Sequence, residues 1–309
     1  MFGKTGNGKQ RFQCLGCHKT FVWSLKRRSE AYRLRLFREW INESYSIRQL
    51  MVQSGLSKST LNRTKAYWIN QKPDSVKEEI DLDKINYIQI DGTYFHRDGC
   101  LFLVIDSMSQ RVIGKRYISR ENLIESLELF KELKKRGLEP GYAALDGHKQ
   151  VRKALEMVWP EIKVQRCLYH IQREGMRWLR TYPKTEAGKE LRCLLSGLCE
   201  IRNKQERDKF IDNFENWQKR HLEFVKGLPS TSVAYKDLKR TMALITYALP
   251  DMFRYLEDEN IDSTTNKLEG LFSRLKAAYR KHRGLTKQNR VQYLNWYCYF
   301  HNLKISNTL

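Results

Sequence analysis

The sequence has 309 residues, of which 41% are hydrophobic and 12% aromatic, so it is long enough for two to three packed domains and too apolar for a disordered chain. No apolar run approaches the ~20 residues that span a bilayer, and no signal peptide is evident. We therefore expect a soluble, cytoplasmic protein with no membrane partner. Seven cysteines with a single Cys-x-x-Cys pair argue for thiols or metal ligands and against a disulfide framework.

The formal net charge of +22 is concentrated at the two ends of the chain. Residues 1–73 hold 15 Lys or Arg against 3 acidic residues, and residues 270–309 hold 8 against none. The middle, 74–269, is nearly balanced, with 34 basic and 32 acidic residues. A balanced centre between two basic ends favours binding of a nucleic acid. A generally basic surface, as on a ribosomal protein, is the alternative.

Residues 1–25 are rich in Gly, Lys and aromatic residues around Cys14 and Cys17. This pattern is typical of the second half of a zinc ribbon, which when complete has two such cysteine pairs. The first pair is missing from this sequence, so we interpret 1–25 as a partial ribbon, truncated at its N-terminus, in which zinc binding is doubtful. The alternative is that His18 and another group complete the site.

Residues 26–72 are predicted to form a helix-turn-helix DNA-binding module. Ser46 and Ser57 are suitable helix N-caps, and Gly55 suits the tight turn between the two helices. The second helix of such a module enters the major groove, while basic residues around it contact phosphates. The expected contacts are Lys58, Ser59, Thr60, Asn62 and Arg63 to bases, and Arg27, Arg28, Arg33 and Lys65 to phosphates. A plain helical hairpin is the alternative.

The pattern changes to strands after a linker at 71–75, and residues 85–170 are predicted to form the first part of a catalytic core. Short turn-bounded gaps separate the first three strands, as in an antiparallel meander. We expect strands at 85–90, 101–105, 111–118, 142–145 and from 162, with helices from 123 to Gly137 and over 149–158. The order β-β-β-α-β-α-β is that of the RNase H-like fold.

The remainder of the chain is expected to be helical. Residues 171–258 contain no convincing strand, and their leucines and aromatics recur at helical spacing, which predicts an all-helical insertion. A final core helix is expected to begin near Ser263, so that residues 259–309 combine this helix with a basic C-terminal one. The predicted class is α/β: an RNase H-like core (β-β-β-α-β-α-β-α) interrupted by an all-α insertion.

Three acidic residues fall where this fold would bring them together. Asp91 is expected to end the first strand, Asp146 to end the neighbouring fourth strand, and Glu269 to lie in the first turns of the final helix. Phosphodiester cleavage uses two divalent ions ~4 Å apart, and Mg²⁺ prefers carboxylate oxygens. We predict these three residues as catalytic metal ligands. Taken singly, each has an ordinary alternative as a turn or a solvated helix residue, and Asp106 is a rival ligand.

Four short strings carry a resemblance to a known family. They are Ile-Asp-Gly-Thr-Tyr (90–94), Leu-Asp-Gly-His (145–148), Cys-Leu-Tyr-His (167–170) and Ser-Thr-Thr-Asn-Lys-Leu-Glu-Gly (263–270). Together they resemble the Mutator-like bacterial insertion-sequence transposases over about 85–285, in a zinc-binding variant. The resemblance implies that Asp91, Asp146 and Glu269 form an Asp-Asp-Glu (DDE) triad, and that Cys167 and His170 are the family's signature.

The sequence leaves the role of this signature open. Two ligands do not close a zinc site, so we expect the pair to position either DNA or the helix that bears Glu269; burial as a small residue is the alternative for Cys167. Asn266 lies on the same side of that helix as Glu269 and is expected to orient it or touch a phosphate. Further DNA contacts are expected at Arg274 and Arg280, and Arg173 is a candidate for contact with unpaired bases in the insertion. Stacking on unpaired bases is conceivable for Trp178 and Trp217, although core packing is favoured.

These features predict a DNA transposase that binds double-stranded DNA at its element's terminal inverted repeats and at the target, as a homodimer or larger oligomer. The expected reaction is strand cleavage with two Mg²⁺ or Mn²⁺ ions, followed by attack of the freed 3′-hydroxyl on target DNA. Two alternatives stay open. One is a nuclease of the same fold that does not transfer strands, and the other is a catalytically silent DNA-binding repressor derived from a transposase.

Overall fold

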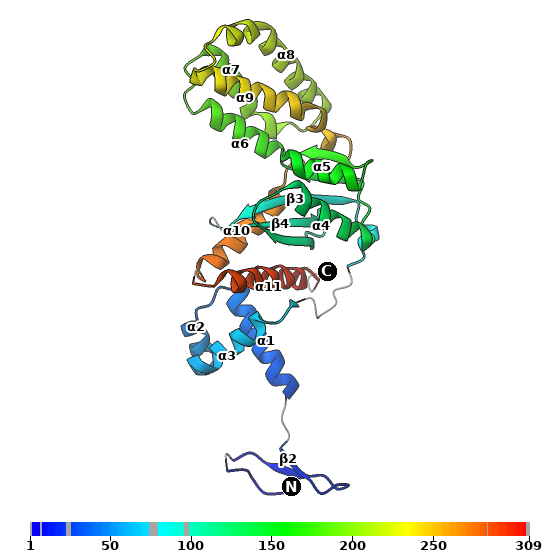
Figure 1. Ribbon diagram of the computed structural model, residues 1–309, viewed down its shortest axis with the longest axis vertical. Coiled ribbons are helices and arrows are strands. Elements are labelled where there is room, and N and C mark those ends of the chain that lie inside the picture. Colours follow the sequence, from blue (N-terminus) through cyan, green and yellow to red (C-terminus); the bar gives the residue numbers. More distant parts are fainter. Residues whose placement is uncertain are drawn as a thin grey trace. The chain divides into compact units, whose positions relative to one another are not determined.

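The computed structural model describes residues 2–6, 8–22, 26–73, 80–95, 99–282 and 284–306, with the backbone alone for 26–29. The chain divides into two compact units. The first contains residues 1–72 and 278–296, and the second contains residues 73–277 and 297–309. The predicted C-terminal part, 259–309, is thus shared between the two units. Figure 1 labels the helices and strands and colours them along the sequence.

The first unit begins with a short antiparallel hairpin of β1 (Arg11–Gln13) and β2 (Thr20–Val22). Phe12 and Phe21 face each other in the register, and their rings stack with centroids 6.0 Å apart. An isolated two-stranded hairpin is marginally stable in water. This ring pair is therefore the main apolar contact that the hairpin has of its own.

Three helices follow, and the two predicted around Gly55 are present. They are α1 (Lys26–Asn42), α2 (Ile47–Ser54) and α3 (Lys58–Ile69). Ser46 and Gln49 form a capping box at the start of α2, in which each side chain accepts from the other's backbone N–H. Gly55 ends α2 at φ 68°, the left-handed region that favours glycine, and Ser57 caps α3.

The core of this unit joins residues that are far apart in the sequence. Trp40 of α1 packs edge-on against Tyr293 of α11 (Lys287–Ser306), with ring centroids 5.5 Å apart. The indole N–H of Trp296, also on α11, donates to the carbonyl of Trp68 at 3.0 Å. Tyr293 donates its hydroxyl to the carbonyl of Ile41 at 2.8 Å. The C-terminal helix therefore supplies part of the core on which the N-terminal helices pack.

The second unit is built on a five-stranded mixed sheet of order β5-β4-β3-β6-β7. Strands β3 to β5 form an antiparallel meander, and β6 and β7 run parallel to β3. The predicted order β-β-β-α-β-α-β is confirmed, as is the predicted pairing of the first and fourth strands. The elements, with a short 3₁₀ turn before them at Leu82–Lys84, are β3 (Tyr87–Tyr94), β4 (Cys100–Asp106), β5 (Val112–Ile118), α4 (Leu123–Lys135), β6 (Tyr142–Leu145), α5 (Lys149–Val158) and β7 (Lys163–Arg166).

The two faces of the sheet have different partners because side chains alternate along a strand. Ile88 and Ile90 of β3 join the apolar core that includes Phe130 of α4 and Leu155 of α5. Gln89 and Asp91 therefore point to the opposite face. At the sheet edge, the Asn302 amide of α11 both accepts from and donates to the backbone of Val112, at 2.8 and 2.9 Å. The side chain of Asn302 thus forms hydrogen bonds with backbone groups of Val112 that would otherwise be unpaired on this edge strand.

A helical region separates β7 from the last core helix. It comprises α6 (Leu168–Leu179), α7 (Glu186–Ser196), α8 (Lys204–Gly227) and α9 (Val233–Ala248), with 3₁₀ turns η3 (Leu198–Glu200), η4 (Leu249–Asp251) and η5 (Arg254–Leu256). All residues from 167 to 265 are described, and none lies in a strand. Leucines and aromatics that recur at helical spacing, among them Leu191 and Phe214, are buried in a core of this region's own. Figure 1 shows the helices of this region gathered beyond α5.

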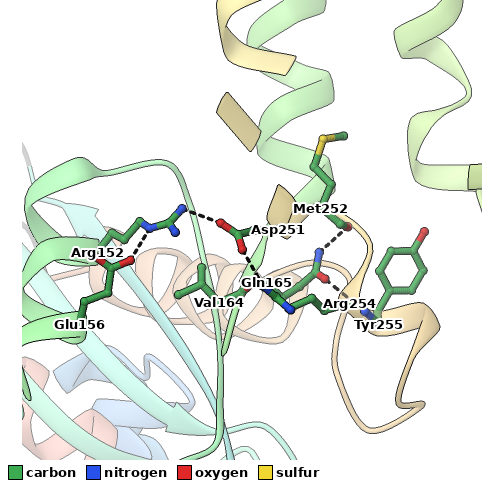
Figure 2. Close-up of polar contacts among 8 residues, drawn as sticks. All are labelled: Arg152, Glu156, Val164, Gln165, Asp251, Met252, Arg254 and Tyr255. Atoms are coloured by element: carbon green, nitrogen blue, oxygen red, sulfur yellow. Dashed lines mark hydrogen bonds and ion pairs between the residues drawn. The ribbon is translucent and has the colours of Figure 1, made fainter. Parts of the chain in front are cut away.

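Figure 2 shows how this helical region is joined to the sheet. The buried carboxylate of Asp251 in η4 accepts hydrogen bonds from Arg152 of α5 at 2.7 Å and from Arg254 of η5 at 3.1 Å. The fully buried Gln165 of β7 donates to the carbonyl of Met252 at 2.7 Å and accepts from the backbone N–H of Tyr255 at 3.2 Å. Buried polar groups at the junction are therefore satisfied by partners from both sides.

The last core helix, α10 (Asn266–Arg280), begins three residues after the predicted start near Ser263. The physical reason is that the Ser263 carbonyl accepts a hydrogen bond from the backbone N–H of Leu168. This segment thus pairs with the β7–α6 connection before the helix starts. Among the described residues, no helix has the length and apolar character needed to cross a bilayer.

Candidate functional site

Asp91 and Asp146 lie side by side at one end of the sheet. Strands β3 and β6 are parallel neighbours, and Ile90 pairs with Leu145, so the two aspartates follow paired positions. The expectation that Asp91 ends its strand is wrong, because β3 continues through Asp91 and Gly92 to Tyr94. The reason is that Asp91 to Tyr94 still pair with β4, from Leu103 to Cys100. Asp146 does directly follow β6, as predicted.

Glu269 occupies the first turn of α10, and the signature cysteine fixes the start of that helix. The buried Cys167 Sγ accepts hydrogen bonds from the backbone N–H and the hydroxyl of Thr265, at 3.3 and 3.4 Å. The carbonyl of Thr265 then accepts the backbone N–H of Glu269 at 3.0 Å. Of the roles left open for this cysteine, the contacts show one: Cys167 anchors the turn that bears Glu269.

A second set of contacts ties the same segment to the sheet. The Asp262 carboxylate accepts hydrogen bonds from Gln89 of β3 and from Lys267 of α10, both at 2.7 Å. Lys267 also donates to the carbonyl of Ser107 at 2.9 Å. Because Gln89 and Asp91 share a face of β3, these contacts hold α10 on the face to which Asp91 points.

His170, the second signature residue, lies at the carboxylates. Ligand atoms of Asp91, His170 and Glu269 all lie within 4.8 Å of one another, which is close enough for a shared metal ion. His170 Nε2 is 3.5 Å from Glu269 Oε1. Glu269 Oε1 and His170 Nδ1 are buried, and neither has a hydrogen-bond partner among the described residues. Buried polar atoms normally have one, so these two are available to a ligand.

Glu121, which the sequence analysis missed, is a fourth carboxylate at this site. It lies between β5 and α4, its side chain is only 9% exposed, and its Oε2 is 3.9 Å from His148 Nε2. A Cβ on Gly92 would lie 1.9 Å from Glu121 Oε1, so the glycine after Asp91 leaves room for this carboxylate. The sequence signal was a Glu at the strand-to-helix junction, which has no distinctive motif around it.

Crowding and burial perturb these acids. Burial, followed by the nearby Asp146 carboxylate, raises the pKa of Asp91 to about 8. The same two causes raise the pKa of Glu121 to about 7. Burial lowers the pKa of His170, and the charge of Arg173 lowers it further. Like charges held together in a partly dry site are costly without a cation, and pKa values perturbed in this way are typical of functional sites.

These groups line one cavity of about 730 Å³. Its wall also carries positive charge, from Arg166, Arg173 and Lys276. Arg166 is the last residue of β7 and is 8% exposed, and burial lowers the pKa of its guanidinium. Arg173 lies over the Tyr169 ring at 5.4 Å. A cavity lined by both acidic and basic side chains suits a polyanion whose reacting phosphate must approach metal ions.

Other predicted site residues take different places. Asp106 accepts hydrogen bonds from the backbone of Met108 and Ser109, at 3.1 and 3.0 Å, and does not line the cavity; it shapes the β4–β5 turn instead of acting as a rival ligand. Trp217 is buried and donates to the carbonyl of Ala187 at 2.9 Å, as favoured for core packing. Trp178 is half-buried, and Asn266, Arg274 and Arg280 are exposed.

The residues predicted to read DNA bases lie on α3. Lys58, Ser59 and Arg63 are exposed, and Thr60 and Asn62 are half-buried. Lys65, predicted to contact phosphate, lies 5.5 Å above the Trp40 ring. Arg33, Thr60, Arg63 and Tyr67 are among the residues that line a groove of about 470 Å³. The side chains of Arg27 and Arg28 lie outside the described residues.

The cysteine pair lies in the connection between β1 and β2. Cys14 is half-buried and Cys17 exposed, and both are free thiols. Hydrogen bonds from the backbone of Cys17 and Gly16 lower the pKa of Cys14. Within the described part of the chain, neither His18 nor any other Cys, His, Asp or Glu joins them as a third ligand. Two thiols do not make the four-ligand zinc site of a ribbon.

Comparison with known proteins gives one strong match. Residues 104–291 match the model of the family described as "Transposase, Mutator family". The HTLV-2 integrase catalytic core domain in complex with magnesium is 16% identical, with 50% of this chain and 83% of that chain covered and a TM-score of 0.22. A chain of the simian T-cell lymphotropic virus intasome in complex with PP2A regulatory subunit B56 gamma is 15% identical, with 68% and 67% covered and a TM-score of 0.23.

TM-scores of this size do not establish a common fold, and no curated protein sequence matches the chain. The family model, in contrast, spans well over half of the chain and includes Asp146, Cys167, His170 and Glu269. This chain belongs to the Mutator family of transposases.

Proposed function

We propose that this transposase cleaves and joins DNA in an RNase H-like core, with Asp91, Asp146 and Glu269 as ligands of divalent metal ions. One observation carries the proposal: Asp91, His170 and Glu269, from three separate elements, place ligand atoms within 4.8 Å of one another. Asp146 lies beside Asp91 on the neighbouring parallel strand. The raised pKa of Asp91 supports the same conclusion, because its causes include the charges of Asp146 and Glu269.

The donor set fits Mg²⁺ or Mn²⁺. Carboxylate oxygens suit both ions, and an imidazole nitrogen is better tolerated by Mn²⁺. Within the part of the chain that the structure describes, the buried Glu269 Oε1 has no hydrogen-bond partner, as expected of an atom that binds a cation. When bound, two such ions supply an activated nucleophile and neutralise charge on the phosphate.

The proposed reaction consists of two in-line displacements in one cavity. In the first, a water molecule loses a proton as its oxygen bonds to the phosphorus at the element's end, and the 3′ oxygen leaves and gains a proton. In the second, this 3′-hydroxyl loses its proton, bonds to a target phosphorus and displaces the target's 3′ oxygen. Cys167 and Thr265 hold the turn that carries Glu269, so the acid stays fixed while substrates change, which is the kind of positioning that lowers such barriers.

We further propose that residues 26–72 bind the terminal inverted repeats as a helix-turn-helix, with Lys58, Ser59 and Arg63 of α3 in the major groove. The exposure of these three side chains supports this role. Residues 171–258 would form an insertion in the catalytic core, and residues 1–25 a partial zinc ribbon. Two element ends must be brought together, so we propose a dimer or larger oligomer on double-stranded DNA.

The test is cleavage of a DNA duplex that carries the element's end, with Mn²⁺ or Mg²⁺. Asp91→Asn and Glu269→Gln should each lower the cleavage rate more than about 100-fold while they leave duplex binding intact. Asp212→Asn, at an exposed position on α8, is the matched control and should cleave normally. Thermal unfolding adds a second readout, since Mn²⁺ should stabilise the wild type but not Asp91→Asn.

The outcomes separate the remaining functions. Cleavage with joining to a target supports a transposase, whereas cleavage without joining would show a nuclease. DNA binding with no cleavage by the wild type, under any divalent ion, would show a repressor. Normal cleavage by Asp91→Asn would remove Asp91 from the mechanism.

A further inference from the structure

Arg166 is a buried cation in the catalytic cavity, and no acid among the described residues forms an ion pair with it. It ends β7, pairs in register with Leu145, and is 8% exposed. Its Nε has no hydrogen-bond partner, and within the described residues no carboxylate oxygen lies within 4.0 Å of its guanidinium. Buried guanidinium groups are nearly always paired. The position of Arg166 therefore needs a reason other than packing.

The surrounding contacts show why none of the described acids forms an ion pair with Arg166. The charge of Asp146, and less strongly that of Asp251, acts on Arg166. Asp251 is already shared by Arg152 and Arg254 (Figure 2). The neighbouring Gln165 is fixed by the backbone of Met252 and Tyr255, as Figure 2 also shows. The backbone that carries Arg166 is thus held firmly, Asp251 is committed to two other arginines, and Asp146 is a proposed metal ligand.

The loop after Asp146 makes room for the guanidinium. A Cβ on Gly147 would lie 2.3 Å from Arg166 Nη2 and 3.0 Å from its Cζ. Gly147 is not among the residues with positive φ, so the backbone itself does not require glycine here. The space is kept for Arg166, and the residue before Gly147 is the proposed ligand Asp146. The guanidinium of Arg166 is therefore held beside the loop that carries Asp146.

We infer that Arg166 binds a non-bridging oxygen of the phosphate at which the DNA strand is cut. The inference rests on the proposed function, because it takes the reacting phosphate to lie in the cavity lined by Asp91, Asp146 and Glu269. A guanidinium matches phosphate oxygens in geometry and charge. Held in place before the reaction, it stabilises negative charge that grows on these oxygens in the transition state. Bound phosphate would also supply the partner that Arg166 lacks.

The test compares Arg166→Met with Arg166→Lys in single-turnover cleavage of an element-end duplex. Arg166→Met should cleave about 100- to 1,000-fold more slowly than wild type, because loss of one preorganised hydrogen-bond donor typically lowers a rate by this factor. Arg166→Lys keeps a positive charge but lacks the planar guanidinium, so its cleavage rate should lie between those of wild type and Arg166→Met. Arg116→Met is the matched control and should cleave within about twofold of wild type. Arg116 lies on β5, the edge strand at the other side of the sheet, and is paired with Glu128 and Glu132 of α4.

Two further measurements separate a catalytic role from a structural one. Without DNA, Arg166→Met should unfold at the same temperature as wild type or higher, because it removes an unpaired buried charge. A clear fall in that temperature would overturn the inference in favour of a structural arginine. On a duplex whose scissile phosphate is a neutral methylphosphonate, the ratio of wild-type to Arg166→Met rates should shrink at least about tenfold.

The remaining outcomes are distinguishable. An unchanged rate ratio on the methylphosphonate, or full activity of Arg166→Met on the normal duplex, would overturn the role of Arg166 and leave the proposed function standing. A wild-type protein that cuts neither duplex with Mg²⁺ or Mn²⁺ would instead overturn the proposed function, and the inference with it.

Discussion

Gly92 and Glu121 compete for one space in the cavity: a Cβ on Gly92 would lie 1.9 Å from Glu121 Oε1. Gly92 lies inside β3 and has no positive φ, so its conformation does not call for glycine. The Asp-Gly pair at 91–92 is therefore no turn signal in this chain. The glycine instead leaves room for a second acidic side chain, that of Glu121, close to the backbone beside Asp91.

Gly92→Ala is expected to displace the Glu121 carboxylate and disturb the site. An added methyl group in a filled space costs roughly 1–3 kcal/mol of unfolding free energy, and misplacement of site groups by about 1 Å costs about 100-fold in rate. Urea unfolding and single-turnover cleavage measure the two effects. The double variant Gly92→Ala/Glu121→Ala should regain part of the lost stability, because the nearest clash is gone while the one with Cys100 Sγ, at 2.7 Å, remains. Strictly additive losses would show that Glu121 is not the group displaced.

Cys167→Ala is expected to loosen the start of α10. The substitution leaves the backbone N–H and hydroxyl of Thr265 without their buried acceptor, at a cost of roughly 1–3 kcal/mol. Cleavage should fall with stability because Glu269 lies one turn away. Cys199→Ala, a half-buried cysteine of η3, is the control for loss of a thiol. A Cys167→Ala protein with wild-type stability and activity would refute the anchoring role.

Gln165→Leu is expected to weaken the junction shown in Figure 2. Leucine has a similar volume but leaves the carbonyl of Met252 and the N–H of Tyr255 unsatisfied, which should cost roughly 3 kcal/mol. Hydrogen exchange should show faster opening of η4 and η5, while the core between the sheet and α4 keeps its protection. Exchange that quickens uniformly over the chain would argue against a local joint.

The stability of the first unit is expected to fall in mild acid because of His282. Burial is the main cause that lowers the pKa of His282 below its usual value of about 6.5, and Nε2 lies 2.9 Å from the carbonyl of Trp40. A lowered folded-state pKa means that the unfolded chain binds the proton more readily. Stability is therefore kept above pH 6.5 and lost as the pH falls through the folded-state pKa.

The measurement for His282 is thermal unfolding between pH 7.5 and 5 at constant ionic strength. His282→Gln keeps a donor for the Trp40 carbonyl but does not titrate, so its unfolding temperature should fall less over this range than that of wild type. The difference between the two curves isolates this residue from the other histidines. Parallel curves would show that His282 does not contribute.

The local features of this fold were predictable because they depend on neighbouring residues. Serine caps, a left-handed glycine between α2 and α3, and the alternation of apolar residues in β3 are all set by interactions within a few positions. The order of strands and helices follows from the same periodicities. The predicted fold carried the long-range expectation that Asp91, Asp146 and Glu269 meet, and the family strings around them implied the same triad.

The tertiary structure decided which side chains share the cavity. The sequence by itself determined the acids and their elements, but Glu121 and Arg166 carry no motif, and their place depends on space left by Gly92 and Gly147. The sequence likewise left open the role of Cys167 in the signature pair, because its hydrogen-bond partner Thr265 is 98 positions away. Contacts of this kind form only when distant segments pack, because a buried acceptor or cation is defined by all the surfaces that close around it.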